Sequence, residues 1–416
     1  MQSHTLLITD SYPPEIRSAS HLMYELAQAL HTRHHTVSVI TTFPQYNLAE
    51  SQQGRNLPEI SDEEGIRVIR IHTFPIHNVG FLRRGIGVLS LPGAFIRGIK
   101  KHIKTPIDRV LVYSPPLPLA KAGAWVAQKY HARYLLNVQD IFPQNAIDLG
   151  IMKNHLLIHF FKRMEHKAYQ RADHVTVHST GNREFLLKEQ IVEPEKLSIL
   201  HNWVDPEPFD KTTRTNTFRK RFGLENRFIV LFAGVLGPAQ GLDTVIHLAE
   251  KTKDIEEIVY LLVGDGTEKD RLQHAAQSRK LHSIQFRPFV SKEEYPSLVK
   301  EVDVGLVCLS SQMKTPVVPG KLQGYMAAQI PVLATLNAES DGFAIIHDSQ
   351  CGFVALSEDT EQAATHLRTL YKMSPEARMA LGQNGRRYVE KYFAKDVCVS
   401  EIEHIFSSID KPRGKT

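Results

Sequence analysis

The sequence predicts an α/β protein with two doubly wound, parallel-sheet domains. The chain has 416 residues, which is long enough for two domains with large cores. Short apolar strands alternate with helical patterns almost from the start, as expected for parallel strands joined by crossover helices. The same alternation restarts after residues 210–216 (DKTTRTN), a polar stretch without periodicity, so a domain boundary is expected nearby.

The first half of the chain contains the elements of one such domain. Residues 5–9 (TLLIT) form the first predicted strand, residues 18–30 carry apolar side chains at helical spacing, and residues 37–41 (VSVIT) form the second strand. A strand–helix–strand unit of this kind implies parallel strands and a right-handed crossover. Further short strands are predicted at residues 67–71, 110–113, 134–138, 176–178 and 198–200.

The second half repeats the pattern. Strands are predicted at residues 228–233, 259–263, 284–286, 304–309 and 331–334. Helices are predicted at residues 241–252, 268–279, 321–328, 361–373, 374–392 and 397–409. We therefore expect an N-terminal domain over residues 1–205, a C-terminal domain over residues 206–392, and a last helix with a basic tail over residues 393–416.

The composition favours an anionic partner and excludes several classes of protein. The formal net charge is +5, a mild basic excess that suits an anionic ligand or a membrane surface. The cations do not gather in one stripe interleaved with aromatic residues, so nucleic-acid binding is not expected. Three widely separated cysteines and the lack of an HExxH motif suggest neither a disulfide framework nor a zinc site. A reducing, cytoplasmic location without a metal is therefore predicted.

No signal peptide or membrane-spanning helix is predicted. Residues 1–14 lack a cationic leader region, and residues 85–96 (GIGVLSLPGAFI) are too short to cross a bilayer and are expected to break at Pro92 and Gly93. The wider segment of residues 81–104 interleaves apolar side chains with six lysines and arginines. Two interpretations stay open for it: a surface that docks on anionic lipid, or a helix whose apolar face packs on its own sheet.

Three loops of the second domain are candidates for binding a phosphate group. Residues 234–237 (GVLG) and 264–266 (GDG) follow predicted strands, and glycine would let a ligand approach bare backbone. In the third loop, Lys321 begins a predicted helix, where a cation opposes the helix dipole unless an anion such as a diphosphate lies between them. A surface lysine on an ordinary amphipathic helix is the alternative. Neither GxGxxG nor GxxxxGK[ST] occurs, which disfavours a dinucleotide site and a P-loop.

Seven short segments carry a family resemblance. They are residues 12–18 (YPPEIRS), 137–143 (NVQDIFP), 202–209 (NWVDPEPF), 234–242 (GVLGPAQGL), 262–266 (LVGDG), 319–332 (PGKLQGYMAAQIPV) and 382–393 (GQNGRRYVEKYF). Each is weak alone, but together and in this order they make nearly the whole chain resemble the family 4 glycosyltransferases of the GT-B fold. The matching branch is the WbuB-like one, with O-antigen and capsule enzymes.

The resemblance implies two Rossmann-like domains that face a cleft, with the last helix crossing back to the first domain. It implies retaining transfer of a sugar, with an N-acetylated amino sugar as one option, from a nucleotide diphosphate donor that is most often UDP-linked. The acceptor would be a glycan or a polyprenyl-diphosphate-linked molecule in bacterial surface polysaccharide synthesis, at the inner face of the cytoplasmic membrane. No metal or other cofactor is implied, because cations and helix dipoles meet the diphosphate charge.

The resemblance also assigns site residues. Asp140 matches the acidic residue that this branch carries in its N-domain loop, with acceptor or sugar contact as its role and general-base work less favoured. A helix N-cap before Ile141 is the alternative for Asp140. The N-domain side also includes Glu15, Arg17 and Ser18. The donor side is assigned to Gly234, Gly237, Gln240, Gly264, Gly266, Gly320, Lys321, Leu322, Gln323 and Tyr325.

Gly324 departs from the family pattern. It stands where relatives carry a glutamate that contacts the donor ribose, and Pro316 replaces the other glutamate of that pair. The missing contact is worth roughly 1.5–3 kcal/mol, unless Gln323 or a backbone group compensates. Three functions therefore stay open: an active glycosyltransferase, a non-catalytic homologue that scaffolds an assembly complex, and a nucleotide-sugar epimerase.

Overall fold

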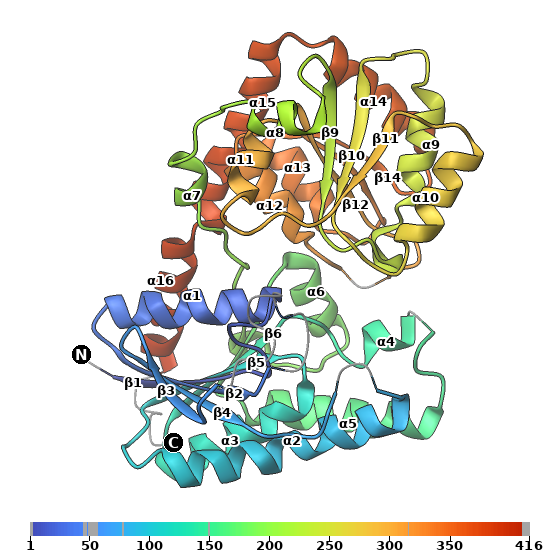
Figure 1. Cartoon of the computed structure of the whole chain (residues 1–416). Helices are drawn as coiled ribbons and strands as arrows, with labels where there is room; N and C mark the ends of the chain where they lie inside the picture. Colours follow the sequence, from blue (N-terminus) through green and yellow to red (C-terminus); the bar gives the residue numbers. More distant parts are fainter. Residues whose placement is uncertain are drawn as a thin grey trace. The chain divides into compact units, whose positions relative to one another are not determined.

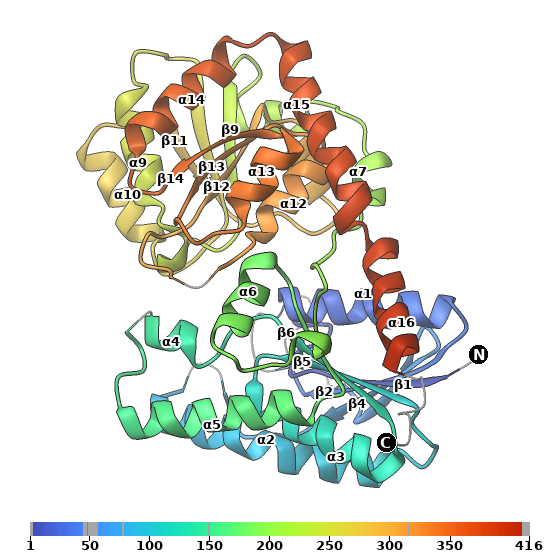
Figure 2. The same ribbon diagram turned by 180° about the vertical axis from the view of Figure 1, so that it is seen from behind.

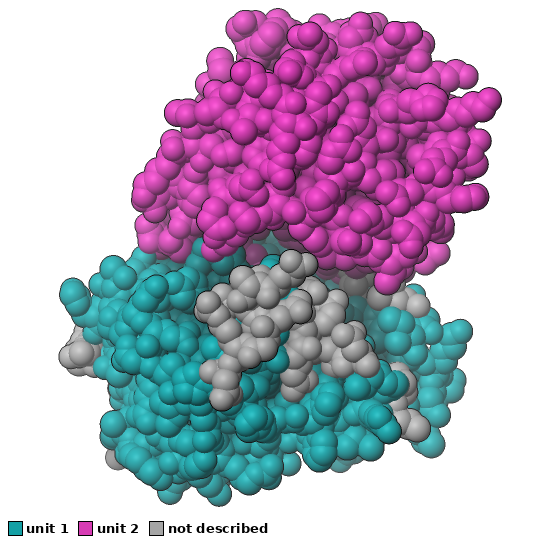
Figure 3. Space-filling view, in the orientation of Figure 1, with its two compact units in different colours: residues 1–201, 398–416 teal, residues 202–397 magenta. Residues whose placement is uncertain are grey.

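Two β-sheets organise the chain (Figure 1). The computed structural model describes residues 3–44, 48, 57–76, 79–148, 150–314 and 316–409. The chain divides into unit 1, residues 1–201 and 398–416, and unit 2, residues 202–397 (Figure 3). Each unit has its own sheet with helices on both faces, which confirms the predicted α/β class with two Rossmann-like domains. The basic tail of residues 411–416 lies outside the described residues.

Unit 1 is built on an eight-stranded sheet of order β3-β4-β2-β1-β5-β6-β7-β8. All neighbours are parallel except β3 and β4. β3 and β4 form a hairpin that turns at Glu64 and Gly65, whose φ angles of 56° and 82° are both left-handed, as a tight hairpin requires. Its first strand was not predicted from the sequence. The strands are β1 His4–Ile8, β2 Thr36–Thr42, β3 Ile60–Glu63, β4 Ile66–Ile71, β5 Arg109–Ser114, β6 Arg133–Val138, β7 His174–Val177 and β8 Leu197–Ile199.

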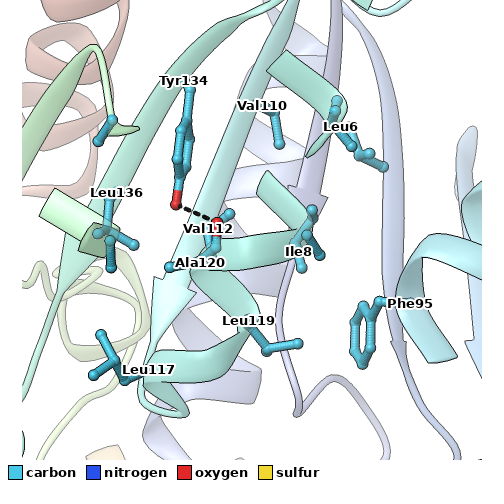
Figure 4. Close-up of a cluster of buried hydrophobic side chains, with 14 of the residues drawn as sticks. Leu6, Ile8, Phe95, Val110, Val112, Leu117, Leu119, Ala120, Tyr134 and Leu136 are labelled. Atoms are coloured by element: carbon cyan, nitrogen blue, oxygen red, sulfur yellow. Dashed lines mark hydrogen bonds between the residues drawn. The ribbon is translucent and has the colours of Figure 1, made fainter. Parts of the chain in front are cut away.

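The main core of unit 1 lies on the face of the sheet that α2, α3 and α5 cover (Figure 4). Leu6 and Ile8 of β1 and Tyr134 of β6 point into it, and Phe95 enters from α2. The Tyr134 hydroxyl donates to the Ala120 carbonyl at 3.1 Å, so its polar atom is satisfied inside the core. The helices of this unit are α1 Ser18–Thr32, α2 Phe81–His102, η2 Leu117–Leu119, α3 Ala120–Tyr130, α4 Gln144–Asp148, α5 His155–Arg171, α6 Thr180–Lys188, η3 Pro194–Lys196 and α16 Lys395–Ile409.

The last helix returns to the first domain, as predicted. From Cys398 on, α16 belongs to unit 1 and lies beside α1 (Figures 1 and 2). Glu403 accepts from Arg33 at the end of α1 and from His35 Nε2 at 2.9 Å. The Arg109 guanidinium lies 5.3 Å from the centre of the Phe406 ring.

α2 corrects one expectation from the sequence. The predicted break at Pro92 and Gly93 does not occur, because the helix continues through both residues from Phe81 to His102. Just before the proline, the Ser90 hydroxyl donates to the Gly87 carbonyl at 2.7 Å. Within the described ranges, no helix has the length and apolar content needed to cross a bilayer.

Unit 2 is built on a six-stranded, all-parallel sheet of order β11-β10-β9-β12-β13-β14. Separate apolar cores cover its two faces. The strands are β9 Phe228–Ala233, β10 Ile258–Val263, β11 Ile284–Arg287, β12 Val304–Cys308, β13 Val332–Leu336 and β14 Gly352–Leu356. The helices are α7 Glu207–Asp210, α8 Thr217–Phe222, η4 Pro238–Gln240, α9 Asp243–Lys251, α10 Lys269–Ser278, α11 Tyr295–Lys300, α12 Gly320–Ala327, α13 Gly342–Ser349, α14 Thr360–Lys372, α15 Pro375–Tyr388 and the π-helical turn η5 Val389–Phe393.

Candidate functional site

Each of the three loops predicted to bind phosphate follows one of three adjacent strands in unit 2. β9 lies between β10 and β12, with Ala233 in register with Val263. The loops after β9 and β10 therefore leave the sheet together, and α12 follows the loop after β12. All three loops meet at the edge where doubly wound domains bind ligands.

The glycines of the first two loops serve the contact between the loops. A Cβ on Gly264 would lie 1.9 Å from the Gly234 carbonyl oxygen, and one on Gly266 would lie 2.3 Å from the Leu236 carbonyl oxygen. Both glycines have a φ, 154° and 155°, that side-chain-bearing residues rarely adopt. The Leu236 N–H donates to the Asp265 carbonyl at 2.8 Å. Close backbone packing therefore explains Gly264 and Gly266 without the ligand approach that the sequence suggested.

Gly234 makes room for Lys321. A Cβ at Gly234 would lie 2.7 Å from Lys321 Cε, so any larger residue would displace the lysine side chain from its present path across this loop. The ammonium donates to Gln240 Oε1 at 2.7 Å and lies 4.7 Å from the centre of the Phe232 ring. These contacts bring Gly234, Gln240 and Lys321 together at one point of the sheet edge.

The Lys321 ammonium has no anionic partner in the part of the chain that the structure describes. Burial disfavours its charged form and lowers its pKa to about 8. A partly buried cation that pairs only with a neutral amide and an aromatic ring is poorly compensated. The geometry therefore favours an anion at this point.

The start of α12 adds to this edge. No side chain caps the helix, and its first residue, Gly320, is exposed with open space where a Cβ would stand. Uncapped N–H groups in the first turn attract negative charge. Gly237 has extended backbone, with φ −125°, immediately before η4, which carries Gln240.

Leu322 and Tyr325 do not reach the surface. Both side chains are fully buried in the unit 2 core. The Tyr325 hydroxyl donates to the Leu231 carbonyl at 2.9 Å and accepts from the Ala233 N–H at 3.2 Å. It thereby ties α12 to the end of β9. The buried side chains of Leu322 and Tyr325 therefore hold the helix that carries Lys321 and do not face a ligand.

Gln323 and Gly324 are also placed inside the unit. The Gln323 side chain is buried, and its amide nitrogen donates to the Asn202 carbonyl at 2.7 Å. A Cβ on Gly324 would lie 3.2 Å from the Tyr295 hydroxyl. Tyr295 therefore borders the space into which a side chain at position 324 would grow.

The carboxyl edge of the unit 1 sheet holds a cluster of charged residues after β1. Asp10 is buried, and its Oδ2 lies 3.3 Å from Arg17 Nη1. The same guanidinium nitrogen lies 3.8 Å from Glu15 Oε2, which accepts from the Ser11 hydroxyl at 2.7 Å. Ser18 is exposed and begins α1. Arg17 and Glu15 thus shape the loop around Asp10.

Asp10 retains one carboxyl oxygen without a partner. Oδ1 is buried and makes no hydrogen bond with any described residue, and burial raises the Asp10 pKa above its usual value. β1 and β5 are neighbours, whereas the chain runs from β1 to β2 on the other side, so Asp10 lies at the switch point of the sheet. Switch points are where ligands bind in such folds.

Asp140 lies at the same edge, after β6. Its side chain is solvent-accessible, yet enough protein surrounds it for desolvation to raise its pKa. Asp140 and Asp10 both raise the pKa of the Tyr113 hydroxyl at the end of β5, beyond the larger effect of burial, so the three groups lie close together. The alternative that Asp140 caps a helix is wrong, because α4 begins only at Gln144.

Sequence reasoning missed two residues of this cluster. Asp10 was not singled out, and Tyr113 was predicted only as the end of a strand. A polar residue directly after a buried parallel strand was the available signal for Asp10. No trio of His, Cys, Asp or Glu suited to a metal ion occurs among the residues that the structure describes.

These two edges define a two-domain α/β protein with a cationic ligand edge in one unit and an acidic one in the other. Residues 19–203 match the family model described as "Glycosyl transferase 4-like domain", and residues 214–388 match "Glycosyl transferases group 1". The two models together span most of the chain, which therefore belongs to the glycosyltransferases of the GT-B type.

Two named relatives are about one-quarter identical in sequence to this chain over the aligned residues. The putative colanic acid biosynthesis glycosyl transferase WcaI of Escherichia coli (strain K12) is 26% identical over 340 residues, or 80% of this chain and 83% of WcaI. The probable glycosyltransferase WbjE of Pseudomonas aeruginosa is 24% identical over 271 residues, or 63% of this chain and 67% of WbjE.

Solved structures share the fold over nearly the full length. A sucrose-phosphate synthase from Thermosynechococcus elongatus superposes with a TM-score of 0.76 at 16% identity, covering 98% of this chain and 99% of that one. HepE of Anabaena, determined in complex with UDP, superposes with a TM-score of 0.71 at 16% identity, covering 98% of this chain and 100% of HepE. At these identities the likeness establishes the fold.

Proposed function

We propose that this protein is a retaining glycosyltransferase that moves a sugar from a UDP-linked donor to a glycan or a polyprenyl-diphosphate-linked acceptor. The observation that carries the proposal is the Lys321 ammonium at the carboxyl edge of the unit 2 sheet, which pairs only with Gln240 and the Phe232 ring among the described residues. A diphosphate is the anion that a nucleotide sugar would bring to this edge.

Donor binding would complete the surroundings of Lys321. With a pKa of about 8 the ammonium is mostly protonated at neutral pH, and a nearby phosphate favours that form further. The uncapped start of α12 adds positive potential at the same point. We therefore assign the diphosphate charge to Lys321 and α12 and propose that transfer needs no metal. The HepE complex with UDP supports UDP as the nucleotide.

The chain's own residues would act by orientation and charge stabilisation. As the bond from the sugar to the diphosphate breaks, negative charge grows on the leaving oxygen, and Lys321 stabilises it. The acceptor hydroxyl would be held by Asp10 Oδ1 and Asp140. Its oxygen would form the new bond to the sugar carbon that the diphosphate leaves, and its proton would pass to the departing phosphate. In this scheme Tyr325 and Gly234 position Lys321 without touching the substrate.

The likeness to WcaI and WbjE supports a role in bacterial surface polysaccharide synthesis. On the seven motifs we place the chain in the WbuB-like branch, with O-antigen or capsule as the product class and an N-acetylated amino sugar as the transferred group. A lipid-linked acceptor would bring the protein to the inner face of the cytoplasmic membrane.

One observation favours a second candidate, a non-catalytic relative. Gly324 supplies no carboxylate, and the Gln323 amide is engaged by Asn202. If the ribose contact is merely missing, the double variant Gly324→Glu with Tyr295→Phe should bind UDP about tenfold more tightly, because the second change clears the hydroxyl 3.2 Å from the new Cβ. Weaker binding in isothermal titration would mean that the pocket has been rebuilt around Tyr295.

The deciding experiment is a thermal-shift panel of UDP, GDP, dTDP and ADP, each with magnesium and with EDTA. Stabilisation by one nucleotide in EDTA, lost in Lys321→Ala, supports the proposal, because a ligand that binds only the native state raises its stability. No response to any nucleotide would favour the scaffold. Turnover of the matching nucleotide sugar without an acceptor, giving a new nucleotide sugar, would instead indicate an epimerase.

A further inference from the structure

Exposed large apolar side chains gather on two helices of unit 1. They are Ile86 and Leu89 on α2, and Ile151, Leu156, Leu157 and Phe160 on α5 or just before it. Both helices contact η2 and α3, and both lie along the same end of unit 1 (Figures 1 and 2). Scattered single apolar residues need no explanation, whereas several close in sequence on one helix do.

The first half of α5 has an apolar face that the described residues leave exposed. No residue of the helix before Glu165 is buried, and Leu156 and Phe160 are 82% and 45% exposed. The segment is nevertheless well fixed. The Asn154 side chain caps the helix by accepting from the N–H groups of Leu156 and Leu157 at 3.0 and 3.2 Å, and Phe161 packs edge-on against Phe142. The start of α5 is therefore a capped amphipathic helix whose apolar face has no partner among the residues that the structure describes.

The exposed Lys, Arg, Asp and Glu side chains within residues 151–171 have one sign. Residues 151–171 contain Lys153, Lys162, Arg163, Lys167 and Arg171, all exposed. The single acidic residue of the segment, Glu165, is buried under Tyr169, and desolvation raises its pKa to about 7. Neither Lys153 nor Arg163 forms an ion pair with a described residue. The face therefore combines exposed apolar groups with uncompensated positive charge.

The second half of α2 is different, and this changes the membrane hypothesis drawn from the sequence. Leu91, Phe95 and Ile99 are fully buried in the unit 1 core. Lys101 pairs with Glu59 at 2.8 Å, and Lys100 lies over the Trp125 ring at 5.3 Å. Here the core-packing interpretation holds, and the exposed large apolar side chains described on α2, Ile86 and Leu89, lie in its first half.

We propose that the first half of α5, together with the exposed start of α2, docks this protein on an anionic lipid bilayer. Leu156, Leu157 and Phe160 would enter the boundary between headgroups and acyl chains, and the lysines and arginine around them would contact lipid phosphates. A second copy of the chain fits this face less well, because a two-fold contact would place the same cations against one another. The proposal does not depend on donor binding in unit 2.

The test is flotation of the full chain with vesicles of phosphatidylcholine alone, and of phosphatidylcholine with about one third phosphatidylglycerol. The wild type should float with the anionic vesicles and be released by high salt. Leu156→Ser with Phe160→Ser should lower the partition coefficient at least about tenfold. The matched control is Phe289→Ser with Met379→Ser, which removes side chains of similar exposure, 55% and 53%, from unit 2.

Charge variants distinguish the contribution of α5 to vesicle binding from that of α2. Lys162→Gln with Arg163→Gln should weaken vesicle binding, whereas Lys100→Gln with Lys101→Gln should change it little, because those lysines are engaged within unit 1. Because Leu156 and Phe160 are exposed, the melting temperature of their variant should match the wild type. Equal flotation of the α5 variant and the wild type would overturn the proposal. So would a dimer in light scattering that the α5 variant converts to monomer without any vesicle binding by the wild type.

Discussion

The two units hold their ligand-type loops in different ways at the same edge of the same kind of sheet. In unit 2 the loops after β9 and β10 pack backbone against backbone, which leaves no space for a Cβ at Gly264 or Gly266. In unit 1 the loop after β1 is held by side chains, with Arg17 between Asp10 and Glu15. The first arrangement is fixed by sterics and the second by charge.

The difference extends to what each edge leaves uncompensated. Unit 2 retains a partly buried ammonium at Lys321, and unit 1 retains a buried carboxyl oxygen at Asp10. An ammonium suits a diphosphate, and a carboxyl oxygen suits a sugar hydroxyl that donates a hydrogen bond. The comparison teaches that two sheets of the same doubly wound kind can present opposite charges at the same edge when the loops after their strands differ.

The largest effect is expected where backbone packing is tightest. Gly264→Ala would place a methyl group 1.9 Å from the Gly234 oxygen at a φ of 154°, so the loops must separate. We expect unit 2 to lose at least about 2 kcal/mol of unfolding free energy. Urea denaturation measures this, with Gly320→Ala as the control, since open space surrounds that position. Equal stability of the two variants would show that the loops are not fixed by sterics.

Removing the cation should affect binding more than stability. Lys321→Ala deletes the ammonium and its bond to Gln240, and we expect UDP affinity to fall about 10- to 100-fold, as for loss of a charged hydrogen bond. Isothermal titration measures the change. Lys269→Ala is the matched control, because that lysine begins α10 and pairs with Asp265 at 3.2 Å. If both variants bind UDP alike, the diphosphate does not contact Lys321.

A change at the carboxyl edge of the unit 1 sheet should lower the rate of sugar transfer without changing UDP affinity. Asp10→Asn keeps the shape of the side chain but weakens its pairing with Arg17. Arg17 keeps Glu15 as an ionic partner at 3.8 Å, so we expect only a small loss of stability. Transfer to the acceptor should fall at least about tenfold while UDP affinity stays unchanged. Asp62→Asn, in the β3–β4 hairpin of the same unit, is the control. Unchanged transfer by Asp10→Asn would remove Asp10 from the acceptor site.

Much of the fold could be predicted because buried parallel strands are short apolar runs. Residues 228–233 were predicted as a strand with the bounds that β9 has in the structure. β3 was missed because its sequence, ISDE, is polar and lies at the sheet edge, where only β4 pairs with it. Helix α2 was expected to break at Pro92, but packing of Leu91, Phe95 and Ile99 on the sheet outweighs the local effect of the proline.

The candidate site was less predictable because pairs distant in sequence create it. The pattern around Lys321 indicated an anion, but nothing in the sequence linked Gly234 to the lysine side chain that crosses it. Leu322 and Tyr325 were assigned to the donor site with their neighbours, whereas helical periodicity turns both into the core. The relation between Asp10, Tyr113 and Asp140 depends on strand order, which the sequence does not specify.

The smallest expected effect is that of pH on UDP affinity, and it is reversible. Because the Lys321 pKa is lowered to about 8, the ammonium should be about nine-tenths protonated at pH 7 and about one-tenth at pH 9. UDP affinity should therefore fall by up to about tenfold over this range. The free energy of unfolding of the unliganded protein should instead rise with pH over this range. Above pH 8 the unfolded chain binds the Lys321 proton more tightly than the native state does.

A permanently charged side chain provides the control for this last prediction. Lys321→Arg should bind UDP with little change between pH 7 and pH 9, since a guanidinium does not lose its proton in this range. Titrating the same nucleotide with both proteins separates ionisation of the ligand from ionisation of the site. A wild-type affinity that stays constant while the arginine variant also stays constant would show that the ammonium does not face the bound anion. The contrast between a cationic edge in unit 2 and an acidic edge in unit 1 would then lose its functional meaning.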